Sequence, residues 1–156
     1  RLGAGIGMNV VAWTFNPDDA LAKELGVELA ELDDVLRRAD VVSLHVRQSP
    51  EATGMLGTEK LALMKPNAIL VNTARGALID EQALVVALRK GELGGAALDV
   101  FVEEPLPADH PLLEAPNTLL TPHSAGLSPE ALEAGLVMAV ENIGHFFEGS
   151  PVNVVV

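Results

Sequence analysis

Residues 68–100 read AILVNTARGALIDEQALVVALRKGELGGAALDV, and this stretch decides the fold. Ala68–Asn72 is an almost continuous apolar run, which is typical of a strand buried on both faces of a sheet. Asp80 is a good N-cap for a helix that runs to Lys90. Ala96–Val100 is the next apolar run and predicts the next strand. A strand, a helix and a strand in this order form a crossover unit with parallel strands.

The same alternation continues on both sides of this unit. Further strands are predicted at three short apolar runs, Asn9–Trp13, Asp40–Val46 and Thr118–Thr121. Capping and helix-stop residues predict helices from Asn16 to Gly26, over Glu31–Arg38, from Thr58 to Lys65, and from Ser128 to Gly149. The proline-rich segment Phe101–Asn117 is predicted to be a loop. The chain therefore predicts an α/β fold of Rossmann type with a doubly wound parallel sheet.

Composition narrows the classes of function. The 156 residues carry a formal net charge of −12 and no basic cluster, so we expect no nucleic-acid partner, because phosphate contacts need Lys and Arg. The lack of cysteine excludes disulfides and thiolate metal sites, and it fits a reducing, cytoplasmic location. No apolar run approaches the roughly 20 residues of a membrane-spanning helix, so we expect no membrane partner.

Three chemically useful side chains follow predicted strand ends. Arg75 lies in an Ala-Arg-Gly turn, Glu104 lies in a Glu-Glu-Pro turn, and His123 follows a proline. Ligands bind outside the carboxyl ends of the strands in sheets of this kind, so one cleft could hold all three. A guanidinium can bind a substrate carboxylate through two hydrogen bonds, and a histidine beside a carboxylate can move a proton near neutral pH.

Each of these residues also has an ordinary interpretation. Arg75 could form a surface salt bridge, Glu104 could be a solvated loop acid, and His123 could hydrogen-bond to backbone only. Asp99 ends an apolar strand, so it should be partly buried and should pair with a ligand amide or with a loop N–H group. His45 also ends a strand, where it lines a cofactor groove or is a satisfied histidine at the sheet edge.

Two kinds of motif are rejected. The histidines are not spaced like a metal pair and no H-E-x-x-H occurs, so no metal site is predicted. Gly3-Ala4-Gly5-Ile6-Gly7 does not predict a dinucleotide-binding loop, because its spacing is G-x-G-x-G and no strand precedes it. This glycine stretch is predicted instead to end a helix that leads into the strand Asn9–Trp13.

Several short segments follow one another in a specific order: Ala39–His45, Met64–Pro66, Leu70–Gly76, Gly95–Phe101, Glu104-Pro105, His110–Leu112 and Thr121–His123. This series resembles the nucleotide-binding domain of the D-isomer-specific 2-hydroxyacid dehydrogenase family over essentially the whole chain. The order of the segments is more specific than any one of them.

The resemblance implies a role for each candidate. Arg75 would bind the substrate carboxylate and help polarise its 2-keto oxygen, His123 would exchange a proton with that oxygen, and Glu104 would pair with His123. Asp99 would hold the carboxamide of a nicotinamide ring that transfers hydride to C2. The cofactor-binding residues would be Thr14, His45, Thr53, Thr73, Ala74, Asp99, His123 and Gly126.

The predicted activity is hydride transfer between NAD(P) and a small D-2-hydroxy acid or 2-keto acid. One alternative is a formate- or phosphite-type dehydrogenase of the same fold, and another is an NAD-sensing, protein-binding module of corepressor type. A further alternative is an enzyme-like domain without activity. The resemblance also suggests a homodimer, for which the apolar helix Ala131–Phe147 is long enough to serve both core and partner.

Three features depart from the family pattern. The glycine-rich loop and first strand are expected before Arg1, and the substrate domain is expected outside residues 1–156. The chain is therefore expected to be a partial dinucleotide-binding domain that binds NAD weakly or not at all on its own. After the first predicted strand, residues 14–16 (Thr-Phe-Asn) offer neither an acid for the ribose of NAD nor an arginine for NADP, which favours NAD and leaves NADP open. Arg47 stands where many relatives carry proline.

Overall fold

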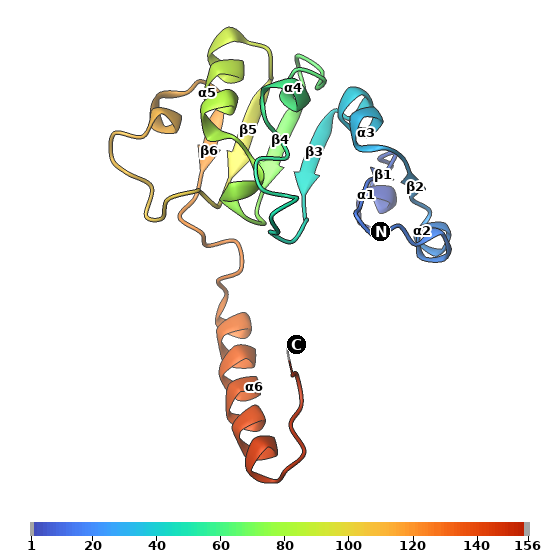
Figure 1. Ribbon diagram of the computed structural model, residues 1–156, viewed down its shortest axis with the longest axis vertical. Coiled ribbons are helices and arrows are strands. Elements are labelled where there is room, and N and C mark those ends of the chain that lie inside the picture. The colour runs from blue at the N-terminus through green and yellow to red at the C-terminus, as the bar shows by residue number, and fades with distance from the viewer. Residues whose placement is uncertain (1, 155–156) are drawn as a thin grey trace. The chain divides into compact units, whose positions relative to one another are not determined.

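A parallel four-stranded sheet organises the first part of the chain. The computed structural model describes residues 2–154, and the chain divides into two units, Arg1–Pro122 and His123–Val156. The strands of this sheet, in spatial order, are β3 (Val41–Leu44), β4 (Ile69–Asn72), β5 (Gly95–Leu98) and β6 (Thr118–Leu120) (Figure 1). All neighbouring strands are parallel, and Leu70 lies opposite Val42 on one side and Ala96 on the other. The prediction of an α/β fold with a parallel sheet is confirmed.

The helix of the central crossover unit begins and ends where the sequence predicts. α5 (Glu81–Lys90) follows the short 3₁₀ helix η1 (Gly76–Leu78). The Asp80 carboxylate accepts hydrogen bonds from the backbone N–H groups of Gln82 and Ala83, both at 3.0 Å. Asp80 thereby satisfies two of the N–H groups that have no partner inside the helix.

The helix predicted from Thr58 to Lys65 is shorter than expected. α4 spans Thr58–Leu61, and Gly57, not Thr58, is its N-cap. Beyond Leu61 the chain continues in turns, in which the N–H group of Leu63 bonds to the Lys60 carbonyl three residues back. The segment between β5 and β6 also contains a short 3₁₀ helix, η2 (Pro111–Glu114), within the predicted loop.

The core of this unit is aliphatic, as the near absence of aromatic residues requires. Its largest fully buried side chains are Leu36, Leu56, Leu70, Leu78, Leu84, Leu93, Leu112 and Val100, together with the polar Asn72. All of them except Leu36 lie beyond residue 40, in or beside the four-stranded sheet.

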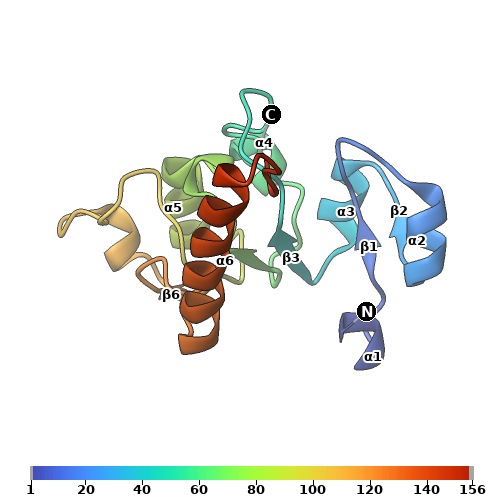
Figure 2. The same ribbon diagram turned by 90° about the horizontal axis from the view of Figure 1, so that it is seen from below.

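Residues 2–40 form a smaller arrangement (Figure 2). Its elements are α1 (Leu2–Gly5), β1 (Val11–Ala12), α2 (Asp19–Leu25), β2 (Glu28–Leu29) and α3 (Leu32–Arg38). α1 ends in the glycine stretch and leads to β1, as predicted. β1 pairs in parallel with β2, a strand that was not predicted because two residues are too short to show a periodic pattern. Among the described residues β1 and β3 are not paired, so the strands form two separate sheets.

The predicted cap of α2 is wrong. Asp18, not Asn16, is the N-cap, and its Oδ1 accepts a hydrogen bond of 2.9 Å from the N–H group of Leu21. The backbone N–H of Asn16 instead donates to the hydroxyl of Thr14 at 3.3 Å. Pro17 therefore lies before the helix and not in its first turn.

The second unit is one long helix with its flanking segments. α6 spans Pro129–Phe147, and the Ser128 hydroxyl accepts a hydrogen bond of 3.1 Å from the N–H group of Ala131, as predicted. None of its residues is buried, and its large apolar side chains include Leu136 and Phe147, which are 70% and 82% exposed. No helix among the described residues is both long and apolar enough to cross a membrane.

Candidate active site

A small cleft lies where β3 and β4 end. Its lining residues are His45, Val46, Arg47, Gln48, Ala74 and Arg75. The two strands are neighbours and parallel, so their carboxyl ends open at the same edge of the sheet. The structure thus brings together His45, Ala74 and Arg75, which were three of the predicted site residues.

A buried asparagine holds the turn that carries Arg75. Asn72, whose residue exposure is 0%, ends β4. Its Oδ1 accepts a hydrogen bond from the Ala74 N–H at 3.0 Å, and its Nδ2 donates to the Arg75 carbonyl oxygen at 2.8 Å. These two bonds hold the backbone of Ala74 and Arg75 in place. They also satisfy the Asn72 amide, which is buried and would be costly to leave unpaired.

The guanidinium of Arg75 is exposed at this turn. Its Nη1 donates to the Ala74 carbonyl oxygen at 2.6 Å, and within residues 2–154 no carboxylate forms an ion pair with it. The ordinary interpretation of Arg75 as half of a surface salt bridge is therefore not seen. An arginine placed in this way can receive a ligand carboxylate.

The turn with Arg75 touches the loop that carries Glu104. A Cβ atom added to Gly76 would lie 2.0 Å from the carbonyl carbon of Phe101, so only glycine allows these two backbones to approach so closely. Glu104 Oε1 accepts a hydrogen bond of 2.9 Å from the N–H group of Phe101. The loops after β4 and β5 are thus packed together, and each carries one of the predicted catalytic residues.

Asp99 is buried and hydrogen-bonded, as predicted. Its residue exposure is 4%, and its Oδ1 accepts a hydrogen bond from the Thr121 hydroxyl. This hydroxyl comes from the residue that follows β6. The pairing of Asp99 with a ligand amide or with a loop N–H group stays a prediction.

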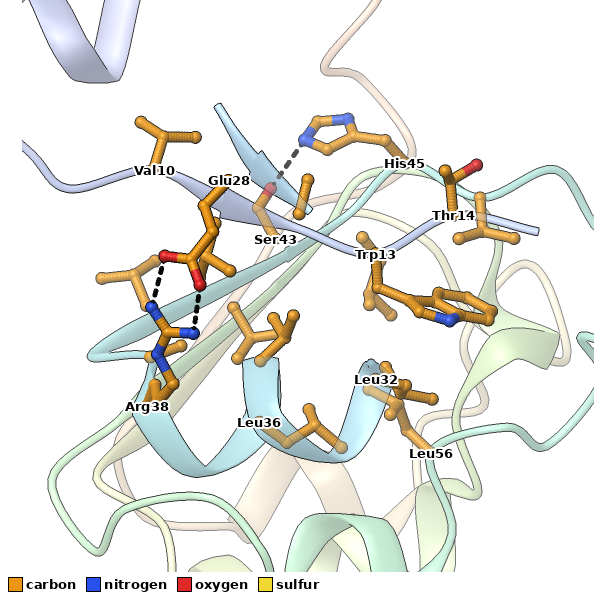
Figure 3. A pocket seen from close by; sticks show the side chains of 18 of the residues that line it. Val10, Trp13, Thr14, Glu28, Leu32, Leu36, Arg38, Ser43, His45 and Leu56 are labelled. Carbon is orange, nitrogen blue, oxygen red and sulfur yellow. Dashed lines mark hydrogen bonds and ion pairs between the residues drawn. The ribbon is translucent and has the colours of Figure 1, made fainter. Parts of the chain in front are cut away.

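A larger cavity lies between β1 and β3 (Figure 3). Thr14 and His45 both line it, and His45 Nε2 lies 2.9 Å from the Ser43 hydroxyl. Its walls combine apolar side chains with polar groups near strand ends, which suits a dinucleotide. The lining residues Thr14, Phe15 and Asn16 include neither an acid nor a cation that would choose between NAD and NADP.

An ion pair borders the same cavity. Both guanidinium nitrogens Nη1 and Nη2 of Arg38 donate to the Glu28 carboxylate at 2.6 Å (Figure 3). These hydrogen bonds hold the pKa of the Glu28 carboxyl below its usual value. Glu28 begins the strand that was not predicted, so sequence analysis assigned it no role.

The remaining predicted residues are not all brought to these cavities. Thr53 donates its hydroxyl to the Ser49 carbonyl oxygen at 2.9 Å and does not line either cavity, and neither does Thr73, which is exposed in the turn after β4. His123 and Gly126 belong to the second unit, where His123 has a left-handed backbone with φ of 52°. The pairing of His123 with Glu104 stays a prediction. No three His, Asp or Glu side chains among residues 2–154 converge as metal ligands.

Sequence reasoning missed the residues that hold the site. Asn72 holds the turn of Arg75 and Thr121 binds Asp99, but the sequence analysis assigned neither residue a role. One signal was available for Asn72: a polar residue that ends an apolar strand needs a partner, which is the argument that found Asp99.

The chain matches one family model and several known proteins. The family model for "D-isomer specific 2-hydroxyacid dehydrogenase, NAD binding domain" matches residues 1–125. The chain is 43% identical over 156 residues to a glyoxylate reductase of Aeropyrum pernix, and the match covers 99% of this chain and 47% of that protein. The chain spans about half the length of relatives such as this glyoxylate reductase, and about a quarter of the D-3-phosphoglycerate dehydrogenases that it matches.

Solved structures show the same fold. The TT0316 protein of Thermus thermophilus is 44% identical, with a TM-score of 0.91 over 99% of this chain and 48% of the other. The D-lactate dehydrogenase of Lactobacillus jensenii, solved with NAD⁺, is 30% identical, with a TM-score of 0.89 over 99% of this chain and 50% of the other. The chain belongs to the D-isomer specific 2-hydroxyacid dehydrogenase family, and residues 1–125 match the model of that family's NAD-binding domain.

Proposed function

We propose that the chain supplies the cofactor-binding part of an NAD(P)-dependent dehydrogenase that interconverts small D-2-hydroxy acids and 2-keto acids. Membership of the family and the names of its relatives support this activity. The observation that carries the proposal is Arg75, which lies in the cleft after β3 and β4 without a carboxylate partner among the described residues.

Arg75 would bind the substrate carboxylate. Its planar guanidinium can form two parallel charge-assisted hydrogen bonds to a carboxylate, which orients the 2-keto group as well as holding it. Asn72 would keep the backbone of this turn rigid, since its side chain bonds to the backbone of Ala74 and of Arg75. Rigid placement matters because small displacements of a reacting group are costly in rate.

Glu104 and His123 would handle the proton. His123 would donate it to the 2-keto oxygen during reduction and accept it from the hydroxyl during oxidation. Glu104 would orient the imidazole and stabilise its protonated form. The bond from the Phe101 N–H to Glu104 supports this role, because it restrains one carboxylate oxygen.

The cofactor would lie along the carboxyl ends of the strands. Asp99 would accept a hydrogen bond from the nicotinamide carboxamide, and its bond with Thr121 would orient the carboxylate. The other residues proposed to line the cofactor site are Thr14, His45, Thr53, Thr73, Ala74, His123 and Gly126. When bound, NAD(P) would supply or accept the hydride at C2 of the substrate. We propose NAD as the cofactor, with NADP as the alternative that the experiment below distinguishes.

The same proposal extends to organisation and location. Residues 1–156 would be part of a dinucleotide-binding domain, with the substrate domain outside them, as the half-length match to relatives supports. The intact protein would be a homodimer, which the exposed apolar side chains of α6 support. A cytoplasmic location is consistent with a chain that has no cysteine.

The experiment is oxidation of NADH and NADPH by the intact protein with a panel of small 2-keto acids. We expect turnover, and a loss of about 100-fold in kcat/KM for Arg75→Ala, because two charge-assisted hydrogen bonds of about 1.5 kcal/mol each are removed. Arg89→Ala is the matched control, since Arg89 is a surface arginine of α5 whose Nη2 lies 3.9 Å from Glu114. Turnover that is equal in Arg75→Ala and the control contradicts the role of Arg75. Tight cofactor binding without turnover on any acid favours the NAD-sensing module.

A further inference from the structure

One carboxylate outside the proposed catalytic set joins two points of the loop after β5. Glu81 is the first residue of α5, and its side chain is only 11% exposed. Its Oε1 accepts a hydrogen bond of 2.8 Å from the N–H group of Val102. Its Oε2 lies 3.4 Å from Nε2 of His110, whose side chain is 15% exposed. A single side chain therefore contacts both the start and the middle of this loop.

The contacts of the two ring nitrogens of His110 suit this arrangement. The N–H group of Leu112 donates to His110 Nδ1 at 3.3 Å, so Nδ1 acts as an acceptor. The proton of a neutral imidazole then lies on Nε2, which faces the Glu81 carboxylate. His110 is also the N-cap of η2, so its ring links that helix to α5.

Glu81 has no capping function in its own helix. Asp80 already caps α5 by accepting hydrogen bonds from Gln82 and Ala83. Both carboxylate oxygens of Glu81 point instead to the loop, at Val102 and His110. The side chains of Glu81 and His110 are both largely shielded from water, so the contact between them restrains the loop more than an exposed contact would.

The restrained segment is the one that links Arg75 to Glu104. The backbone of Phe101 packs against Gly76, next to Arg75, and its N–H group binds Glu104. Val102 directly follows Phe101, so its hydrogen bond to Glu81 holds the segment against α5. We propose that Glu81 is a positioning residue, which holds the Glu104 loop in a fixed place relative to the turn of Arg75 and so sets the geometry of the proposed reaction. The effect on catalysis rests on the proposed function, whereas the restraint on the loop does not.

The chain offers variants that separate the two contacts. Glu81→Ala removes both. Glu81→Gln keeps an oxygen for the Val102 N–H but turns a donor toward the Nε2–H of His110. His110→Asn keeps an oxygen that can accept from Leu112 at the start of η2 and removes the contact with Glu81. Glu92→Ala is the matched control, because Glu92 lies just beyond α5, its side chain is 54% exposed, and it is 3.8 Å from Lys90.

The test measures kcat, KM and the amide hydrogen exchange of residues 100–104 in the intact protein and these variants. For Glu81→Ala we expect kcat to fall about 10-fold or more, since misplacement by about 1 Å can cost about 100-fold, with little change in the KM for the cofactor. Exchange at Val102 should accelerate in Glu81→Ala, while Glu81→Gln should retain slow exchange and most of kcat. Glu92→Ala should match the wild type in both measurements.

Two results overturn the proposal. One is wild-type kcat together with wild-type exchange in Glu81→Ala. The other is a loss of kcat in Glu81→Ala that Glu81→Gln does not rescue and that occurs without faster exchange at Val102. If the wild-type protein turns over no 2-keto acid, the proposed function fails, and exchange at Val102 alone decides the inference: faster exchange in Glu81→Ala supports the restraint, and unchanged exchange removes it.

Discussion

The four-stranded sheet and the two-stranded sheet are built from the same alternation of short strands and helices, yet they differ in their cores. In residues 2–40 only Ala22 and Leu36 are buried hydrophobic residues, at 8% and 0% exposure, whereas all the others lie from Val42 onward. β4 and β5 each have a strand on both sides, while among residues 2–154 β1 pairs with β2 alone. A strand-and-helix pattern thus specifies the elements, but how much of them is buried depends on the neighbours that pack against them, which are more numerous around the four-stranded sheet.

The same difference decides where the site residues are well positioned. Asn72, Asp99 and Phe101 are buried and lie beside central strands, and each restrains a loop that carries a candidate residue. Thr14 follows β1 in the less buried part and lines an open cavity. The site residues whose loops are restrained therefore lie beside the four-stranded sheet, which is also where the buried core lies.

The largest expected difference is between two leucines in helices. Leu84→Ala in α5 should lower the free energy of unfolding by about 2–5 kcal/mol, because Leu84 is fully buried and leaves a cavity. Leu21→Ala in α2 should cost well under half as much, since Leu21 is 49% exposed. Urea denaturation of both variants measures the difference. Equal costs would mean that residues 2–40 have a core after all.

A glycine pair gives the next largest contrast. Gly76→Ala should destabilise the fold by about 1–3 kcal/mol or more, because its Cβ would lie 2.0 Å from the Phe101 carbonyl carbon and neither backbone can easily move. Gly5→Ala in α1 should be neutral or slightly stabilising, since nothing lies within 4 Å of its added Cβ and alanine favours helices. Thermal unfolding of the two variants is the measurement, and a wild-type melting temperature for Gly76→Ala would contradict the close approach.

The two aspartate caps should separate global from local effects. Asp80→Ala should lower the free energy of unfolding by about 1 kcal/mol, the usual cost of losing an N-cap. Asp18→Ala removes a similar bond, but α2 buries only Ala22, so we expect local fraying of the helix with little change in global stability. Amide exchange in α2 together with denaturant unfolding distinguishes the two outcomes. A global loss from Asp18→Ala as large as that from Asp80→Ala would show that α2 unfolds together with the main sheet.

The smallest expected effect concerns the pair that joins β2 to α3. The hydrogen bonds from Arg38 hold the pKa of Glu28 below its usual value in the folded chain. A carboxyl whose folded pKa is lowered contributes stability above its unfolded pKa, and that contribution is lost as the pH falls through the folded pKa. Both side chains are about half exposed, so the effect on stability should be small and should shrink in high salt.

Titration of the Glu28 carboxyl by nuclear magnetic resonance provides the measurement for this pair. Its midpoint should lie below the usual value in the wild type and return toward it in Arg38→Gln. Arg37→Gln is the control, because Arg37 pairs with Asp33 and Asp34 and not with Glu28. An identical Glu28 midpoint in the wild type and Arg38→Gln would show that the pair does not persist in solution.

The sequence by itself determined the central βαβ unit, the caps of α5 and α6 and the parallel order of the sheet. Each of these depends on local patterns, such as the apolar run Ala68–Asn72 or Asp80 before an amphipathic stretch, whose preferred conformation needs few distant contacts. The same patterns placed Arg75 and Asp99 at strand ends, because parallel strands expose their carboxyl ends at one edge.

Only the tertiary structure decided which polar groups meet. Thr121 reaches Asp99 across 22 positions of the chain, and Glu81 reaches Val102 across 21, distances at which no local pattern selects a partner. The strand β2 also escaped prediction, since a strand of two residues shows no periodic pattern. The cap Asp18 escaped it because Asn16, Asp18 and Asp19 are all polar residues that can cap a helix. Burial forces such groups to find partners, but the fold alone determines which partner is within reach.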